Sequence, residues 1–77
     1  MYTVTINNHA YHVDADSLTG AQIKALAAAT GVQPDYELFL VHTPGSGPPE
    51  DKSVANDQTV PIRNGMKFRA LPAGNRG

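Results

Sequence analysis

The segment from residue 18 to residue 32 carries both the start and the stop signals of one short helix. Thr19 is a favourable N-cap, and Gln22, three positions later, completes a capping box. Gly31 supplies the left-handed residue with which helices commonly end. The sequence therefore predicts a helix over about residues 20–30. Because this helix is short and rich in alanine, it needs a sheet to pack against.

The residues before the helix predict a β-hairpin. Residues 2–6 alternate between large apolar residues and threonine, which is the two-residue period of a half-buried strand. The alternation resumes over residues 11–13. Between these runs, Asn7 and Asn8 tolerate the positive φ angles that a tight hairpin turn needs.

The residues after the helix predict two further strands and a weaker one. Residues 38–41 are all apolar, so the sequence does not distinguish the two faces of this strand. In residues 66–70, Lys67 and Arg69 alternate with apolar residues. Residues 51–59 allow at most a short edge strand or a turn, and Pro61 excludes a central strand in its own segment. A right-handed crossover through the helix would place the first and last strands side by side and parallel at the centre of the sheet. The sequence thus predicts an α+β fold of the β-grasp type, with a mixed sheet of four or five strands packed on one helix.

Composition restricts the functions that are open to this chain. It has 77 residues and no cysteine, so we expect a single domain without disulfides, thiolate metal sites or a thiol nucleophile. No stretch approaches the roughly 20 apolar residues of a membrane span, and a net charge of −1 argues against nucleic-acid binding. His9, His12 and His42 have no acid or thiol at a metal-ligand spacing. We therefore expect a cytoplasmic protein that is not an enzyme and holds neither a metal nor a cofactor.

Charge is unevenly distributed along the chain. Up to Asp51, six acidic residues stand against one lysine, whereas from Lys52 onward five basic residues stand against one aspartate. This distribution predicts a basic face around the last strand, which would steer an acidic partner toward the C-terminal residues. Ordinary surface charge is the alternative interpretation.

The last residues contain nothing that would pack into a core and stop on Gly77. We predict a folded domain over residues 1–71 and a flexible tail over residues 72–77. A glycine carboxylate has no side chain crowding it, so an activating enzyme could adenylate it through a narrow channel. The tail therefore suggests a protein whose own C-terminus is the reactive group.

Two sequence motifs carry a resemblance to a known family. An opening of the form Tyr-x-Val-x-Ile-Asn is followed, after the hairpin, by Leu-Thr-Gly-x-Gln-Ile; the residues concerned are Tyr2, Val4, Ile6, Asn7, Leu18, Thr19, Gly20, Gln22 and Ile23. With Phe68 before the tail, this pattern resembles bacterial ubiquitin-like proteins of the multiubiquitin type. The layout is also similar to ubiquitin over nearly the whole chain, including the helix end at residues 31–35.

The resemblance implies a protein modifier of bacterial antiphage operons. Its C-terminal glycine would be exposed by a processing peptidase, activated with ATP by an E1-like enzyme, passed to an E2-like enzyme and joined to a target protein. Gly77 would be the conjugated residue, with Gly74 as a weaker candidate, and Arg76 would be recognised by the enzymes. The chain departs from the pattern in two ways: it has one domain where many relatives have several, and it ends in Arg76-Gly77 where ubiquitin has two glycines.

Alignment with ubiquitin also predicts a partner-binding surface. It places Phe39 and Val41 against the helix, which would leave their neighbours in the strand on the open face of the sheet. An apolar patch with a basic rim on such a face favours partner recognition. The predicted partner-binding residues are Leu38, Leu40, Lys67, Arg69, Leu71 and Arg76.

Two other classes of function remain open. The chain is alternatively a β-grasp binding module that never reacts, with the tail as a linker in a longer protein. A sulfur carrier, which takes a thiocarboxylate on the same glycine, ranks behind because such carriers end in two glycines.

Overall fold

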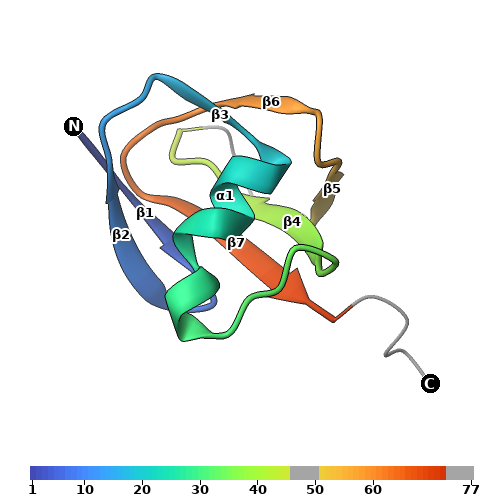
Figure 1. The fold of residues 1–77 in the computed structure, drawn as a ribbon. Helices are drawn as coiled ribbons and strands as arrows, with labels where there is room; N and C mark the ends of the chain where they lie inside the picture. The colour runs from blue at the N-terminus through green and yellow to red at the C-terminus, as the bar shows by residue number, and fades with distance from the viewer. Residues whose placement is uncertain (46–50, 73–77) are drawn as a thin grey trace.

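The computed structural model describes residues 1–45 and 51–72, and its chain folds into one mixed sheet with a helix on one face (Figure 1). The strands are β1 (Tyr2–Ile6), β2 (His9–Val13), β3 (Ser17–Thr19), β4 (Glu37–His42), β5 (Lys52–Val54), β6 (Thr59–Pro61) and β7 (Met66–Leu71). The helices are α1 (Gly20–Leu26) and a short 3₁₀ turn, η1 (Ala28–Thr30).

The main sheet has five strands in the order β2-β1-β7-β4-β5. β1 and β7 run parallel to each other, and the other neighbours are antiparallel. The first and last strands therefore lie side by side within the sheet, as the handedness of the crossover predicts. The predicted ubiquitin-like β-grasp fold, a mixed sheet with one helix, is confirmed.

The hairpin and the turns follow the local sequence. Asn7 and Asn8 have φ angles of 52° and 68°, which let β1 turn directly into β2. Gly65 has a φ of 84° in the turn that it forms with Asn64 before β7. This turn is fastened to β1, because the Gly65 N–H donates to the Thr3 carbonyl at 2.7 Å.

The predicted helix is shorter than its sequence signals indicate. The capping box is present: the Gln22 N–H donates to Thr19 Oγ1, and the Thr19 N–H donates to Gln22 Oε1. The helix tightens into 3₁₀ geometry after Ala27, where successive N–H groups bond to carbonyls three residues back. Gly31, at a φ of 102°, ends this segment as predicted.

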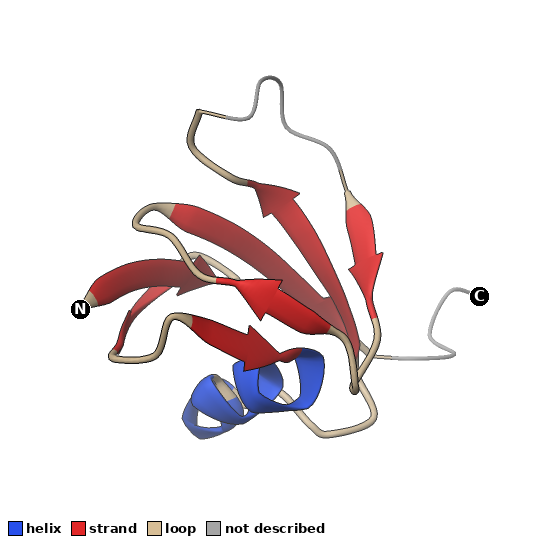
Figure 2. Ribbon diagram, turned by 90° about the horizontal axis from the view of Figure 1, so that it is seen from above, coloured by secondary structure: helices blue, strands red, loops and turns tan. Residues whose placement is uncertain are grey.

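The core lies between the sheet and α1, on the face that Figure 2 shows covered by the helix. It is formed by buried aliphatic and aromatic side chains from nearly every element: Val4, Ile6, Val13, Ile23, Ala27, Val32, Leu38, Val54, Val60, Ile62, Met66, Phe68 and Ala70. The weak segment at residues 51–59 contributes β5 at the edge of the sheet, as expected.

A second, two-stranded sheet was not predicted. β3 pairs with β6, so that Leu18 lies opposite Val60 and Ser17 opposite Pro61. Pro61 is compatible with this position because its strand is not in the main sheet. The small sheet closes the end of the core beside the start of α1 (Figure 1).

Candidate functional site

The face of the sheet opposite α1 is set by the alternation of β7. Its residues are alternately buried and exposed, with Met66, Phe68 and Ala70 in the core. Lys67, Arg69 and Leu71 therefore lie on the open face, as predicted. Leu71 is 42% exposed, a large fraction for a leucine at the end of a strand.

The predicted facing of β4 is wrong. Leu38 lies opposite Ala70 and is only 1% exposed, and Leu40 lies opposite Phe68 and packs against the core. Directly opposite residues share a face, so both leucines point toward the helix side. Leu38 is a core residue and not a surface contact.

Phe39 and Val41 lie on the open face instead. Phe39 is paired with Arg69, and the Arg69 guanidinium carbon lies 5.5 Å from the centre of its ring. The register shifts between Leu40 and His42, so that Val41 is the extra residue of a β-bulge. Because β4 is apolar at both parities, only its pairing with β7 decides which side chains point outward.

Together these side chains form what we call the open-face patch: Phe39, Val41, Lys67, Arg69 and Leu71. The patch borders an open hollow of about 390 Å³, whose walls include Val41, Lys67 and Leu71 and whose far side is the Asn7-Asn8 turn. An apolar floor with two basic side chains suits a protein partner that presents apolar and acidic groups.

Arg69 has intramolecular contacts that fix its orientation. One terminal nitrogen lies 2.8 Å from Asp51 Oδ2, and both side chains are about half exposed. Such an exposed ion pair contributes only about 0–1 kcal/mol to stability, so a partner carboxylate can replace it at low cost.

The proposed reactive residues lie outside the described residues. β7 ends at Leu71, and Arg76, Gly77 and the weaker candidate Gly74 follow in the range 73–77. Six residues lead from Leu71 to Gly77, which is a span of about 20 Å at full extension.

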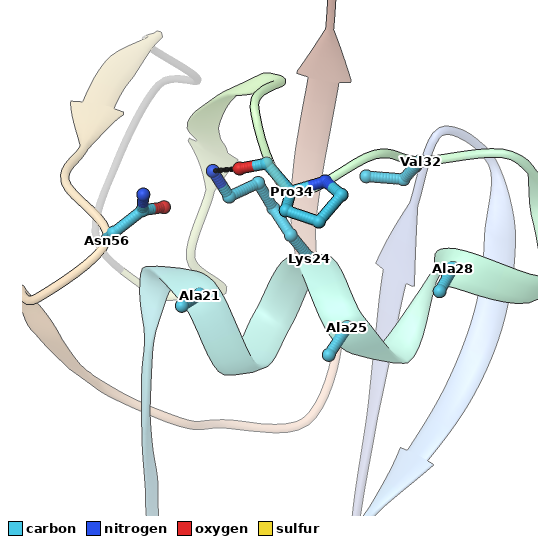
Figure 3. A pocket seen from close by; sticks show the side chains of 7 residues that line it. All are labelled: Ala21, Lys24, Ala25, Ala28, Val32, Pro34 and Asn56. Carbon is cyan, nitrogen blue, oxygen red and sulfur yellow. Dashed lines mark hydrogen bonds between the residues drawn. The ribbon is translucent and has the colours of Figure 1, made fainter.

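The opposite side of the molecule has a small apolar groove beside α1 (Figure 3). Its volume is about 210 Å³, and its walls include Ala21, Ala25 and Ala28 from the helical segments and Val32 and Pro34 from the following loop. Lys24 crosses the groove and is itself buried. Its ammonium donates to the carbonyls of Pro34 and Tyr36, both at 2.8 Å, so it ties the loop to the helix.

Neither a cluster of possible metal ligands nor a membrane-spanning helix is found in the described part of the chain. No three His, Asp or Glu side chains within residues 1–45 and 51–72 come close enough together to hold a metal ion. His12 contacts Thr3, with its Nδ1 lying 3.3 Å from the hydroxyl. Neither helical segment in these ranges has the length and hydropathy needed to cross a bilayer.

The sequence pattern of the Multiubiquitin family matches residues 2–71, which is nearly all of the chain. The chain belongs to the multiubiquitin family. Searches of curated proteins and of solved structures gave no significant match. The match ends at the same residue as β7, and membership makes this a ubiquitin-like protein that is expected to act through protein partners.

The structure explains why both family motifs contain the residues they do. In the first motif, Val4 and Ile6 are core residues of β1, and Asn7 starts the turn. In the second motif, Thr19 caps the helix and Gly20 packs directly against the Ala55 carbonyl, where a side chain would not fit. Sequence reasoning found the helix cap but missed the close packing at Gly20.

Proposed function

We propose that this chain is a protein modifier that is conjugated through Gly77, in a bacterial antiphage pathway. The observation that carries the proposal is the position of Leu71: the chain leaves the sheet beside the open-face patch, six residues before Gly77. An enzyme docked on the patch would thus have the carboxylate within about 20 Å of its contact surface.

The proposed chemistry is acyl transfer. The Gly77 carboxylate attacks the α-phosphorus of ATP in an E1-like enzyme, which releases pyrophosphate and forms an acyl adenylate. A cysteine thiolate of the enzyme displaces AMP, and the thioester passes to an E2-like cysteine. An amine or hydroxyl of the target then takes the acyl group and releases the thiol. The modifier itself supplies the electrophile and the docking surface, and a peptidase processes or removes it.

The open-face patch is the proposed docking surface for these enzymes. Its apolar part would be desolvated by the partner, and Lys67 and Arg69 would pair with partner carboxylates. Arg76 would enter the active site with the tail. Leu38 has no place in this surface, because it is buried in the core.

The proposal is tested by ATP–pyrophosphate exchange with a candidate E1-like enzyme from the same organism. We expect exchange with the wild-type protein and none after deletion of Gly77. Val41→Asp, which puts a charge into the patch, should lower kcat/KM by about tenfold or more, the cost of desolvating an unpaired charge at an interface. The matched control is Ala25→Asp, at an exposed position of α1 away from the patch, which should leave kcat/KM unchanged.

Two results would contradict the proposal. Exchange that persists without Gly77 would assign the chemistry to another position, with Gly74 the next to test. If the wild-type protein binds the enzyme through the patch but is never adenylated, it is a non-reacting binding module.

A further inference from the structure

Asn7 has two separate roles at the point where β1 ends. Its main chain adopts a φ of 52° and starts the turn into β2. Its N–H donates to the Phe68 carbonyl at 3.1 Å, just after the last parallel pair, Ile6 with Phe68. Beyond this bond the main chain of β1 no longer accompanies β7.

The side chain of Asn7 continues the hydrogen bonding to β7 where the main chain turns away. Its Nδ2 donates to the Ala70 carbonyl at 3.1 Å, and its Oδ1 accepts from the Ala70 N–H at 3.0 Å. The amide thus replaces the peptide group that a longer β1 would have presented to β7. Ala70 is 3% exposed, so its main-chain groups would otherwise be buried without partners, which costs about 1–3 kcal/mol for each group.

β7 is therefore held on both sides almost to its end. On the other side β4 pairs Leu38 with Ala70 and Glu37 with Leu71. The Asn7 amide is the last of these contacts from the β1 side. It lies one residue before Leu71, which belongs to the open-face patch.

We propose that Asn7 is a positioning residue for conjugation. Together with the pairing of β4 to Leu71, its side-chain amide holds the end of β7 in the sheet, and so holds Leu71 in the patch and sets the distance from the patch to Gly77. This inference rests on the proposed function. Release of residues 70–71 from the sheet would add two residues, or about 7 Å, to the chain between the sheet and Gly77, and would lower the effective concentration of the Gly77 carboxylate in the active site of a docked enzyme.

The variant Asn7→Gly tests the role of the side-chain amide without disturbing the turn. Glycine adopts the positive φ angle without strain, so the turn is kept and only the amide is lost. Asn8→Gly is the matched control: Asn8 has a φ of 68° in the same turn, and its side chain makes no hydrogen bond to the described residues. Asn7→Asp is a second variant, which keeps an acceptor for the Ala70 N–H but replaces the donor to its carbonyl with a repelling carboxylate oxygen.

The first measurement is amide hydrogen exchange. In Asn7→Gly we expect the Ala70 N–H to exchange about tenfold or more faster, which is the loss of roughly 1.4 kcal/mol of local protection. The Val4 N–H, in the middle of β1, should keep its protection. Asn8→Gly should match the wild type at both positions.

The second measurement is steady-state adenylation by the E1-like enzyme, at a temperature at which circular dichroism shows each variant folded. We expect Asn7→Gly to lower kcat about threefold or more while KM changes less than about twofold, because Phe39, Val41 and Lys67 still dock. Asn7→Asp should also lower kcat relative to the wild type, and it tests the inference should Asn7→Gly not fold.

Each outcome has a distinct meaning. Faster Ala70 exchange with unchanged kcat would show that Asn7 only stabilises the fold, which overturns the inference and leaves the proposed function standing. A lower kcat in Asn8→Gly would show that the turn itself causes the effect, which would also overturn the inference. A wild-type protein that is not adenylated would overturn the proposed function and this inference together.

Discussion

At the residue scale, the hydrogen bond from Tyr2 to Asp16 links β1 to the connection before β3. The Tyr2 hydroxyl donates to Asp16 Oδ1 at 2.9 Å. This hydrogen bond, and the negative charge of Asp16 beside it, raise the pKa of the Tyr2 phenol, while Arg63 opposes the shift. The deprotonated phenol would lose the bond and face a like charge.

This shift predicts a specific alkaline dependence of stability. Because the pKa of Tyr2 is higher in the folded state, the bond's contribution is fully present below the unfolded tyrosine value of about 10 and is lost as the pH rises through the folded value. Subtracting the spectrophotometric titration curve of Tyr2→Phe from that of the wild type should show one phenol whose pKa lies above the ordinary value. Asp16→Asn, which keeps an acceptor but removes the charge, should lower that pKa. A Tyr2 pKa that Asp16→Asn leaves unchanged would contradict the assignment.

At the element scale, the start of α1 is fixed by close packing as well as by its cap. The N–H groups of Gly20 and Ala21 donate to the carbonyls of Gln58 and Asn56, both at 3.1 Å. A Cβ on Gly20 would collide with the Ala55 carbonyl oxygen and lie 3.2 Å from Val54 Cγ1. The helix therefore begins against the segment between β5 and β6, and glycine is needed there for close approach.

We expect Gly20→Ala to destabilise the protein, although alanine favours helices. Overpacking costs about 1–3 kcal/mol and helix propensity returns at most about 1 kcal/mol, so the free energy of unfolding should fall by about 1–2 kcal/mol. Urea denaturation measures this change. The control is Ala29→Ser, which adds one heavy atom at an exposed position of η1 and should stay within about 0.5 kcal/mol of the wild type. Equal stability of Gly20→Ala and the wild type would refute the packing argument.

The elements differ in how far their sequences predict them. The Thr19 cap and Gly31 predict the helix because their signals act within a few residues, and the alternation of β7 predicts its two faces for the same reason. β4 carries no such signal, because both parities are apolar and its bulge at Val41 shifts the register. Its facing depends on pairing with a strand that lies about 30 residues away in the sequence, which local patterns do not contain.

The small sheet was missed for a related reason. β3 and β6 have three residues each, which is too short for a period to show. Their pairing is supported by contacts beyond the strands, such as the Ile62 N–H donating to the Asp16 carbonyl at 2.9 Å. These contacts are between segments far apart in the chain, so only the folded structure brings them together.

Across the whole molecule, the two faces of the sheet differ in burial and in charge. The face toward α1 holds the core, and the open face carries an apolar patch with Lys67 and Arg69 at the end where β7 leaves the sheet. The basic excess after Lys52 is partly explained by this arrangement, because both basic residues of the patch come from the last strand. Docking and delivery of the terminus would thus depend on one strand, with Asn7 holding its end.

This arrangement predicts an asymmetric response to tail length. Deleting Ala73 and Asn75 keeps Gly74, Arg76 and Gly77 but shortens the span after Leu71 from about 20 Å to about 14 Å, whereas inserting two serines after Ala73 lengthens it to about 27 Å. In single-turnover thioester formation with the E1-like enzyme, we expect the deletion to lower the rate at least tenfold, because a carboxylate that falls short cannot react. The insertion should lower this rate only a few-fold, since a longer segment still reaches the active site, although at a lower effective concentration. All three proteins should share one urea midpoint, because the altered residues follow the last strand. Equal rates in all three proteins would show that thioester formation does not depend on the distance from the sheet to Gly77.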